Sequence, residues 1–567
     1  MDDSFSERLA RRWLPAALLG LAPASPVLAA TPPPAPGSGT ILQQAQTKSA
    51  PAPSSGAGTL QIEEPAGATV PASAAFLVSR IEISGNTRID TATLHALVAD
   101  AEGRRLTLSQ LESVVQRLTD YYRAHGYILA RAVVPAQTIH EGVVRVEVVE
   151  ARYDRITVNN RSPVDTRLLE ATLAGLWSGD VVSQDRLDHD LLLLSDIPGA
   201  TVSATLKPGA VAGSSDLQVD ASAAPAVTGS VTADDFGDRY SGADRLGGTL
   251  GLFDPLRHGD ELTLDALTAG SGMNYGRVSY DTLLDGEGAR VGGGYSGLHY
   301  RLGGALSDLD AYGTAQDGML WVRPVALRSR AADVYVQFQY DHLQLNDDIG
   351  AGATENRRHL DTMTTSVSGD ARDQLLAGGS TTWSASWTCG VVSFDNTAAA
   401  TADAASADTQ GVFSKWNLSL GRLQSLDSFD AVYLGAAGQY SSGGNLDSSE
   451  KMVVGGPGSV RAYDVSALSG DAGYQLTAEL RHTFARQRYG VWQAVAFADS
   501  AHVQVNQRAF APGPNAANLY GAGLGLSWTG PDRWTAGIMV ATPIGARPQL
   551  AGDTTDTHLW AQVAKAF

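Results

Sequence analysis

Two residues of opposite charge, Arg461 and Asp499, stand in settings that suit a single buried contact. Arg461 lies in the segment Val460–Tyr463, which follows the glycine-rich stretch Gly455–Gly458 after one serine. Asp499 lies in an alternating segment, where a period of two places it on the same face as Phe497. A guanidinium binds a carboxylate through two parallel hydrogen bonds. Each residue alone would be interpreted as surface charge, but together they predict a charge-assisted contact between a loop and a strand.

Motifs for enzymatic chemistry are missing from the sequence. It contains no Gly-x-Ser-x-Gly elbow, no Walker loop, no Cys-x-x-Cys pair and no His-Glu-x-x-His helix. Its histidines are scattered, which favours structural roles over a metal site. We therefore expect no catalytic residue, no cofactor and no bound metal.

The first 75 residues consist of a leader and a linker. Three arginines precede the apolar run Trp13–Leu21, and small residues end it near Ala30, as in a secretory leader spanning residues 1–30. Residues 31–75 are rich in Pro, Ala, Gly and Ser and cannot form a core alone. Within them, Thr40–Gln46 is a short proline-free island that could be a helix on a host surface or a disordered fragment.

From residue 76 to about 224 the chain repeats one unit twice, with a period of about 75 residues. Apolar patterns and helix-capping residues predict the order β-α-α-β-β in each copy. Asp90 and Asp165 are placed to cap the first helix of each copy, and Thr107 begins a capping box. A strand is expected at Tyr127–Val134. The pattern predicts two small α+β domains, at residues 76–151 and 152–224.

From residue 225 to 567 the pattern changes to a period of two, with turns rich in Gly, Asp and Asn. In Asp333–Asp341, for example, apolar and polar residues alternate. A water-facing sandwich would also alternate, but so many strands with one polar row, behind a leader and with the single cysteine Cys389, favour a closed membrane barrel. At roughly 21 residues for each strand and turn, this region predicts sixteen antiparallel strands.

These features together resemble the Omp85 superfamily, and within it the two-partner-secretion transporters, the outer-membrane exporters of haemolysins and filamentous adhesins. The Arg461 and Asp499 segments resemble its sixth-loop and barrel-wall motifs, and the repeated unit resembles a pair of POTRA domains. The resemblance implies a lock formed by Arg461 and Asp499 between loop and barrel. It implies supporting roles around the lock for Val460, Tyr463, Phe497, Gly455 and Gly456. Ala462 departs from the family pattern, which more often has glycine.

Both ends of the chain fit the same resemblance. The island containing Ile41 and Leu42 resembles the start of a plug helix that occupies the resting barrel. The final strand ends in Phe567, which resembles the signal read by the barrel-assembly machinery. Lys565 stands where an aromatic residue is usual and would have to extend toward the interface.

The resemblance implies a non-enzymatic, monomeric translocator in the outer membrane of a Gram-negative bacterium, with its POTRA domains in the periplasm. Its partner would be an unfolded, β-rich secreted protein with an N-terminal secretion domain, docking by strand addition to POTRA edges. Whether the translocator also activates this partner stays open. A net charge of −19 argues against nucleic acid. An Omp85-type assembly factor, which inserts other barrels, is the alternative.

Overall fold

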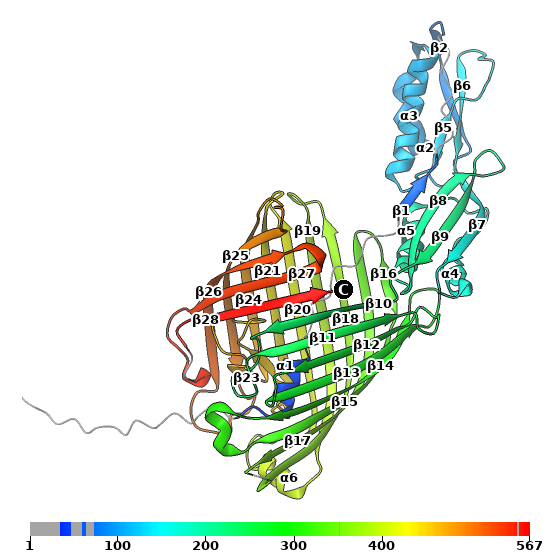
Figure 1. The fold of residues 1–567 in the computed structure, drawn as a ribbon. Helices are drawn as coiled ribbons and strands as arrows, with labels where there is room; N and C mark the ends of the chain where they lie inside the picture. The colour runs from blue at the N-terminus through cyan, green and yellow to red at the C-terminus, as the bar shows by residue number, and fades with distance from the viewer. Residues whose placement is uncertain (1–34, 47–58, 64–72, 351, 553–554) are drawn as a thin grey trace, which may run out of the picture.

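A closed β-barrel, extended at one end by two small α+β units, makes up the computed structural model (Figure 1). The structure describes residues 35–46, 59–63, 73–350, 352–552 and 555–567. The expected leader at residues 1–30 lies outside them. None of the helices in these ranges is both long and apolar enough to cross a membrane.

Sixteen antiparallel strands close the barrel within the described ranges, as the sequence predicted. Seventeen segments are labelled, but β15 and β16 both pair with β17 and form one strand interrupted at Pro324. The strands are β10 (Val227–Asp234), β11 (Arg245–Phe253), β12 (Glu261–Thr268), β13 (Met273–Leu283), β14 (Arg290–Arg301), β15 (Tyr312–Arg323) with β16 (Val325–Arg328), β17 (Ala332–Ile349), β18 (Thr354–Asp373), β19 (Gly379–Phe394), β20 (Gly411–Ser425), β21 (Asp430–Ser442), β24 (Ala472–Thr483), β25 (Val491–Gln504), β26 (Ala516–Thr529), β27 (Trp534–Pro543) and β28 (His558–Ala566).

The last strand closes the barrel against the first. β28 pairs with β10, and the Phe567 amide donates to the Gly229 carbonyl at 2.9 Å. The Phe567 ring lies where a side chain at Gly229 would otherwise stand. The Lys565 ammonium reaches the Asp532 carbonyl in the neighbouring turn, so this side chain extends along the wall to the rim. The seam is thus an antiparallel pairing in which Ser230–Asp234 of β10 lie opposite Gln562–Ala566 of β28.

Apolar and aromatic side chains cover the outside of the barrel. Trp387, Trp416 and Tyr440 lie opposite one another on three adjacent strands, and all three are exposed. Trp492 and Trp528 form a second such pair, with ring centroids 6.2 Å apart. Rows of aromatic residues around an apolar outer band are typical of barrels that cross a membrane.

The first N-terminal unit packs two helices on a small sheet. It comprises β2 (Phe76–Val78), β3 (Arg80–Ser84), α2 (Thr91–Val98), η1 (Ala99–Ala101), β4 (Arg104–Leu106), α3 (Leu108–Ala124), β5 (Arg131–Val133) and β6 (Val143–Val149). Asp90 accepts the Thr93 amide, and Thr107 forms the expected capping box with Gln110. The strand expected from Tyr127 begins only at Arg131, because the Ala130 amide donates back to the Tyr127 carbonyl in a turn.

The second unit repeats the order β-α-α-β-β and rests on the rim of the barrel. It comprises β7 (Arg152–Arg161), α4 (Thr166–Thr172), α5 (Gln184–Ser195), β8 (Ala200–Pro208) and β9 (Ser214–Ala223). Arg328 of the barrel forms ion pairs with Asp196 of this unit at 2.7 Å and with Asp333 at 2.9 Å. Arg330 adds a 2.7 Å pair with Asp188 of α5. The unit is therefore docked beside the barrel opening.

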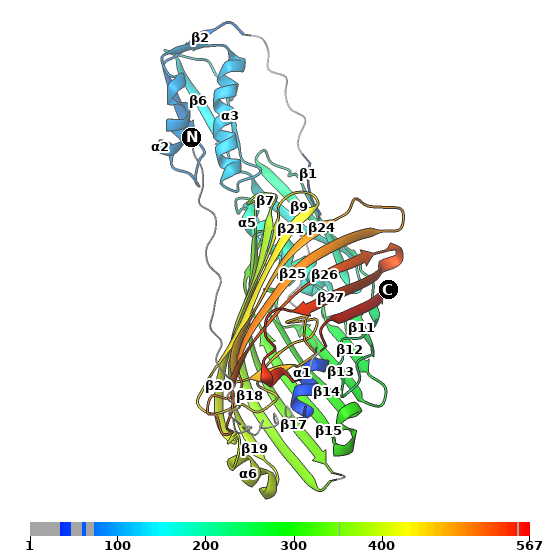
Figure 2. The same cartoon turned by 90° about the vertical axis from the view of Figure 1, so that its left-hand side faces the viewer.

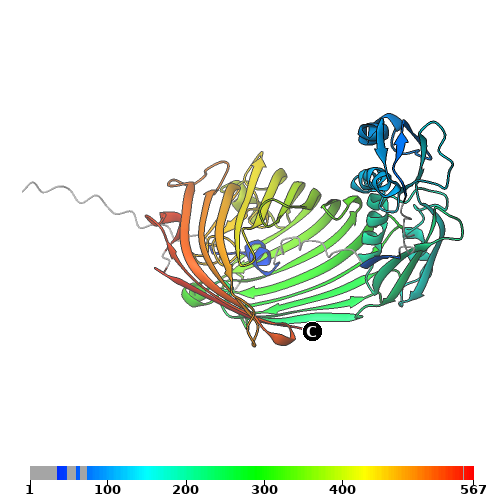
Figure 3. The same cartoon turned by 90° about the horizontal axis from the view of Figure 1, so that it is seen from above.

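A short helix, α1 (Ser38–Ala45), lies inside the barrel, as the views from the side and from above show (Figures 2 and 3). Ile41 and Leu42 are buried against apolar residues of the barrel's inner wall. A second N-terminal segment, β1 (Thr59–Ile62), belongs to the sheet of the second unit, where it pairs in parallel with β8. The remaining short elements, η2 (Gly304–Leu309), α6 (Thr397–Ala404), β22 (Met452–Val454), β23 (Leu468–Gly470), η3 (Pro531–Arg533) and η4 (Gln549–Ala551), lie in connections between spanning strands.

Candidate functional site

The loop of residues 443–471 between β21 and β24, called the inward loop below, folds into the barrel. Its strands β22 and β23 pair with each other. Gly455 and Gly456 have φ angles of 108° and 89°, which only glycine adopts readily. A side chain at Gly455 would also meet the Asp464 carbonyl. These two glycines therefore allow the turn that leads to the tip of the loop at Val460–Tyr463.

Arg461 at this tip contacts Asp499 of β25, so the structure brings the two sequence-predicted residues together. The Nε and Nη2 groups of Arg461 donate to the two Asp499 oxygens at 2.9 and 2.8 Å, and its backbone amide donates at 3.1 Å. The two side chains are 7% and 1% exposed. The guanidinium carbon lies 3.5 Å from the centre of the Phe497 ring. Such a bidentate pair fixes both position and orientation of the loop tip.

Glu479 and Trp560 complete the contact, and the sequence analysis did not assign them to it. Arg461 Nη1 donates to Glu479 Oε1 at 2.7 Å, and Arg481 holds the other Glu479 oxygen. Trp560 Nε1 donates to the Arg461 carbonyl at 2.7 Å. Two arginines thus balance two carboxylates. Glu479 belongs to the alternating polar residues of β24, so the sequence predicts which face of the strand it occupies. The sequence does not predict that it lies opposite Phe497, because that depends on the pairing register of β24 and β25.

Val460 and Tyr463 are buried beside the ion cluster and anchor the tip by packing. They belong to one apolar cluster with Phe497 and residues of β26 and β27. Ala462 is fully buried, and its methyl group occupies the space that a side chain at Gly521 would need. Gly521 on the facing strand therefore makes room for the Ala462 methyl group, which the glycine of the usual family pattern would lack.

Helix α1 contacts both the barrel wall and the inward loop. The Ser38 amide donates to Asp347 of β17 at 2.7 Å, and Gln44 Nε2 donates to Ser466 Oγ at 2.7 Å. The side chain of Gln46 donates to Asp317 at 3.3 Å. Gly39 approaches the backbone of Ser449 so closely that a side chain would collide with it. The helix is held inside the barrel by a few hydrogen bonds and by the packing of a small apolar face.

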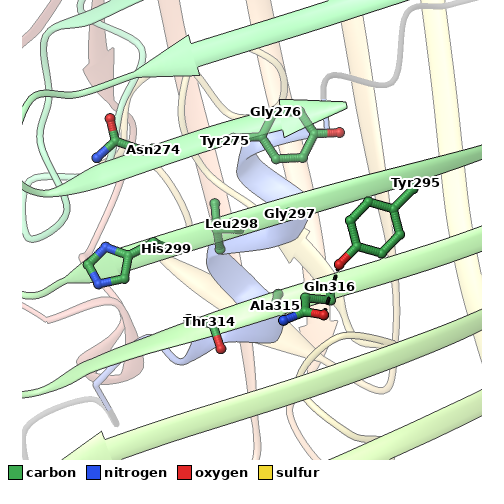
Figure 4. Close-up of a pocket in the computed structure, with 10 residues that line it drawn as sticks. All are labelled: Asn274, Tyr275, Gly276, Tyr295, Gly297, Leu298, His299, Thr314, Ala315 and Gln316. Atoms are coloured by element: carbon green, nitrogen blue, oxygen red, sulfur yellow. Dashed lines mark hydrogen bonds between the residues drawn. The ribbon is translucent and has the colours of Figure 1, made fainter. Parts of the chain in front are cut away.

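The wall behind α1 is thin where glycines replace side chains. A hollow of about 400 Å³ opens on the outer face of β13–β15, where Gly276 and Gly297 lie opposite each other (Figure 4). The Tyr295 hydroxyl donates to Gln316 at its edge, at 2.8 Å. The neighbouring residues Tyr275 and Leu298 point the other way and belong to the apolar cluster around α1. The inner face of these strands therefore forms the surface against which α1 packs.

Segment β1 covers one edge of the second unit. Residues Thr59–Ile62 pair with Ser203–Leu206 of β8, and the Glu63 amide continues the ladder to the Leu206 carbonyl at 2.9 Å. In the first unit, by contrast, β5 pairs with β6 alone among the described strands. The outer edge of β8 is therefore covered by β1, whereas β5 has no second strand beside it among the described strands.

The described residues contain no group of three or more His, Cys, Asp or Glu side chains that could hold a metal ion. Cys389 lies on β19, where its sulfur faces the Met363 carbonyl.

Comparisons with known proteins match nearly the whole architecture. Residues 76–151 match the family model of the POTRA domain, ShlB-type. Residues 213–528 match that of haemolysin secretion/activation protein ShlB/FhaC/HecB. The heme/hemopexin transporter protein HuxB of Haemophilus influenzae is 24% identical over 500 residues, 87% of each chain. The outer membrane transporter CdiB of Dickeya dadantii is 25% identical over 506 residues, 84% of this chain and 85% of the relative.

Solved structures share the fold. The structure of CdiB from Escherichia coli has a TM-score of 0.68 at 23% identity, covering 89% of this chain and 92% of that chain. BamA from Haemophilus ducreyi lacking POTRA domains 1–3 has a TM-score of 0.53 at 13% identity, covering 87% and 100%. The second family model covers more than half of the chain. This protein therefore belongs to the haemolysin secretion/activation family, the outer-membrane β-barrel transporters of two-partner secretion with POTRA domains in the periplasm.

Proposed function

We propose that this protein exports one large, unfolded, β-rich partner, of the haemolysin or adhesin kind, from the periplasm to the cell surface. The observation that carries the proposal is α1, an eight-residue helix inside a sixteen-strand barrel that hydrogen bonds from Ser38, Gln43, Gln44 and Gln46 hold in place. A helix of eight residues is marginal on its own in water and depends on its host surface. It can therefore leave the lumen at moderate cost and free a polar passage.

The second periplasmic unit acts as a second POTRA domain. Its strands and helices follow the order of the first unit, and Asp165 caps α4 as Asp90 caps α2. Its place on the rim, fixed by Arg328 and Arg330, makes it the surface that an arriving chain meets before entering the barrel. The two units together guide the partner toward the opening.

The partner docks by adding a strand to POTRA edges. Such edges carry unpaired backbone groups and accept an extended segment with little demand on its sequence. β5 pairs with β6 alone among the described strands, and the Ala132 amide in its middle donates to Thr119 Oγ1 of α3 at 3.0 Å, whereas the edge of β8 carries β1 of the linker. A partner strand on β8 would displace β1. Because β1 follows α1 in the same linker, this displacement would release the attachment of that linker to the second unit.

The Arg461 contact holds the inward loop against the wall during export. Its ion pairs and the packing of Val460 and Tyr463 keep the loop tip in place at the wall. The exported chain then passes beside the loop through the space that α1 leaves. Phe567 and the last strand serve recognition by the barrel-assembly machinery, and the chain works as a monomer.

The proposal is tested by expressing this protein with the candidate partner encoded beside it, in cells that lack related transporters. We expect the partner in the medium only when both proteins are present. Equal secretion without this protein would overturn the export function. An assembly factor would instead change the yield of other outer-membrane barrels, which the same cells report by their outer-membrane protein profile.

A further inference from the structure

A second buried arginine, Arg358 of β18, holds the inward loop at a place remote from its tip. Arg358 Nε lies 2.5 Å from Asp447 Oδ2 in the first limb of the loop, and Nη2 donates to Ser448 Oγ at 3.1 Å. The Arg358 and Asp447 side chains are 4% and 6% exposed. The Asp447 carboxylate also accepts the Ser449 amide at 2.9 Å. A buried pair with this many bonds fixes the loop limb to the wall.

The same arginine reaches the site that holds α1. Arg358 Nη1 donates to Asp347 at 2.8 Å, and Asp347 also accepts the Tyr300 hydroxyl and the Ser38 amide, both at 2.7 Å. Ser38 is the first residue of the helix. One guanidinium therefore connects a carboxylate of the loop with the carboxylate that binds the start of the helix.

The helix touches the same limb directly. A side chain at Gly39 would stand 2.7 Å from the Ser449 amide and 2.9 Å from Ser448 Oγ. Gln43 Nε2 donates to the Ser449 carbonyl. If α1 left, Asp347 would lose the hydrogen bond from the Ser38 amide, and the loop limb would lose its packing against Gly39.

We propose that Arg358 forms a second lock on the inward loop, independent of the Arg461 lock and shared with the plug helix. Both locks use one arginine between two carboxylates, but the arginine comes from the loop in one and from the wall in the other. Departure of α1 weakens the Arg358 lock and leaves the Arg461 lock intact. The limb near residue 447 then moves while the tip stays. This consequence rests on the proposed export function, but the lock itself does not.

The test labels single cysteines with a membrane-impermeant maleimide in a Cys389→Ala background, on cells and without any partner. Leu446 of the limb and Val460 of the tip are both buried, so a cysteine at either place reports local release. We expect Arg358→Gln to speed labelling at position 446 by about tenfold or more and to leave position 460 unchanged. Asp447→Asn should act in the same direction. Only barrels that stay folded in detergent without heating are scored.

Two further variants separate a lock from general loosening. The double exchange Arg358→Asp with Asp447→Arg keeps one arginine between two carboxylates and should restore slow labelling at 446. Ser38→Pro removes the amide that Asp347 accepts, at a helix position that tolerates proline, and should speed labelling at 446 severalfold. Ser38→Ala removes the hydroxyl alone and should not. Unchanged labelling at 446 in Arg358→Gln, or equal rises at 446 and 460, would overturn the second lock. Because no secretion is measured, failure of the export proposal leaves these outcomes unaffected.

Discussion

Replacing Arg461 with methionine keeps an unbranched apolar side chain and removes the guanidinium group with its charge. Three side-chain hydrogen bonds to carboxylates disappear, at 2.7, 2.8 and 2.9 Å, together with the contact to the Phe497 ring. Asp499 and Glu479 are left buried with Arg481 as the remaining cation of the cluster. The substitution therefore destabilises the loop bound at the barrel wall relative to the released loop.

The size of the effect follows from the burial of the pair. Removing one partner of a buried ion pair costs about 3–5 kcal/mol. At 1.4 kcal/mol for each factor of ten, this corresponds to a shift of roughly 10²- to 4 × 10³-fold toward the released loop. The packing of Val460 and Tyr463 remains, so the loop stays mostly in place but opens far more often.

The assay is maleimide labelling of Val460→Cys, in the Cys389→Ala background, with and without Arg461→Met. The labelling rate at a fully buried position is proportional to the fraction of time that the tip is released. Arg422→Met is the matched control, because Arg422 binds Asp373 through two bonds on the exposed surface of the barrel. We expect no change in labelling for the control. A rise below about tenfold for Arg461→Met, in barrels that remain folded, would refute the lock.

Three further predictions follow from other contacts. Gly521→Val should displace the Ala462 methyl and raise labelling at position 460, whereas a valine at Gly537, a position open to space on the next strand, should leave it unchanged. Burial raises the pKa of Asp190 to about 6, so its charge destabilises the second unit above pH 6 and this penalty fades as the pH falls toward 3.8. Asp190→Asn should therefore raise the free energy of opening of α5, measured by hydrogen exchange, by up to about 3 kcal/mol at pH 8 and change it little near pH 4. Equal changes at both pH values would contradict this prediction. Every second amide of a parallel strand faces the same neighbour, and the Glu63 amide donates to β8, so the Gln61 amide faces β8 as well. Gln61→Pro should therefore remove a hydrogen bond between β1 and β8 and speed amide exchange in β8. Gln61→Ala keeps the amide and changes only an exposed side chain, so it should leave the exchange unchanged.

Much of the architecture was readable because local rules and global fold agree. Asp90, Asp165 and Thr107 are capping residues whose function depends only on the first turn of a helix, and all three cap as predicted. The alternating strands give the two faces of the barrel wall without any knowledge of pairing. The resemblance of the loop and wall motifs placed Arg461 beside Asp499, and the structure brings them together.

Features that depend on register or on distant contacts could not be read in this way. Glu479 joins the Arg461 contact because β24 pairs with β25 in one register among several that alternation permits. Trp560 reaches the Arg461 carbonyl across 99 positions of sequence. Segment β1 is too short to be recognised as a strand and exists through its pairing with β8. Residues Tyr127–Ala130 form a turn where a strand was expected, because the hydrogen bond from the Ala130 amide to the Tyr127 carbonyl outweighs the β-propensity of the segment.

The passage of a partner through the lumen is the central claim, and crosslinking of a stalled partner tests it most directly. A photo-crosslinking residue is placed at Gln337 or at Phe338, neighbours on β17 of which Phe338 is 49% exposed on the outer face while the Gln337 side chain bonds within the luminal row. A partner fused to a stably folded domain is then trapped during export. We predict crosslinks to the partner from position 337 and none from position 338. Export without any crosslink from position 337, or equal crosslinks from both, would contradict a path through the barrel.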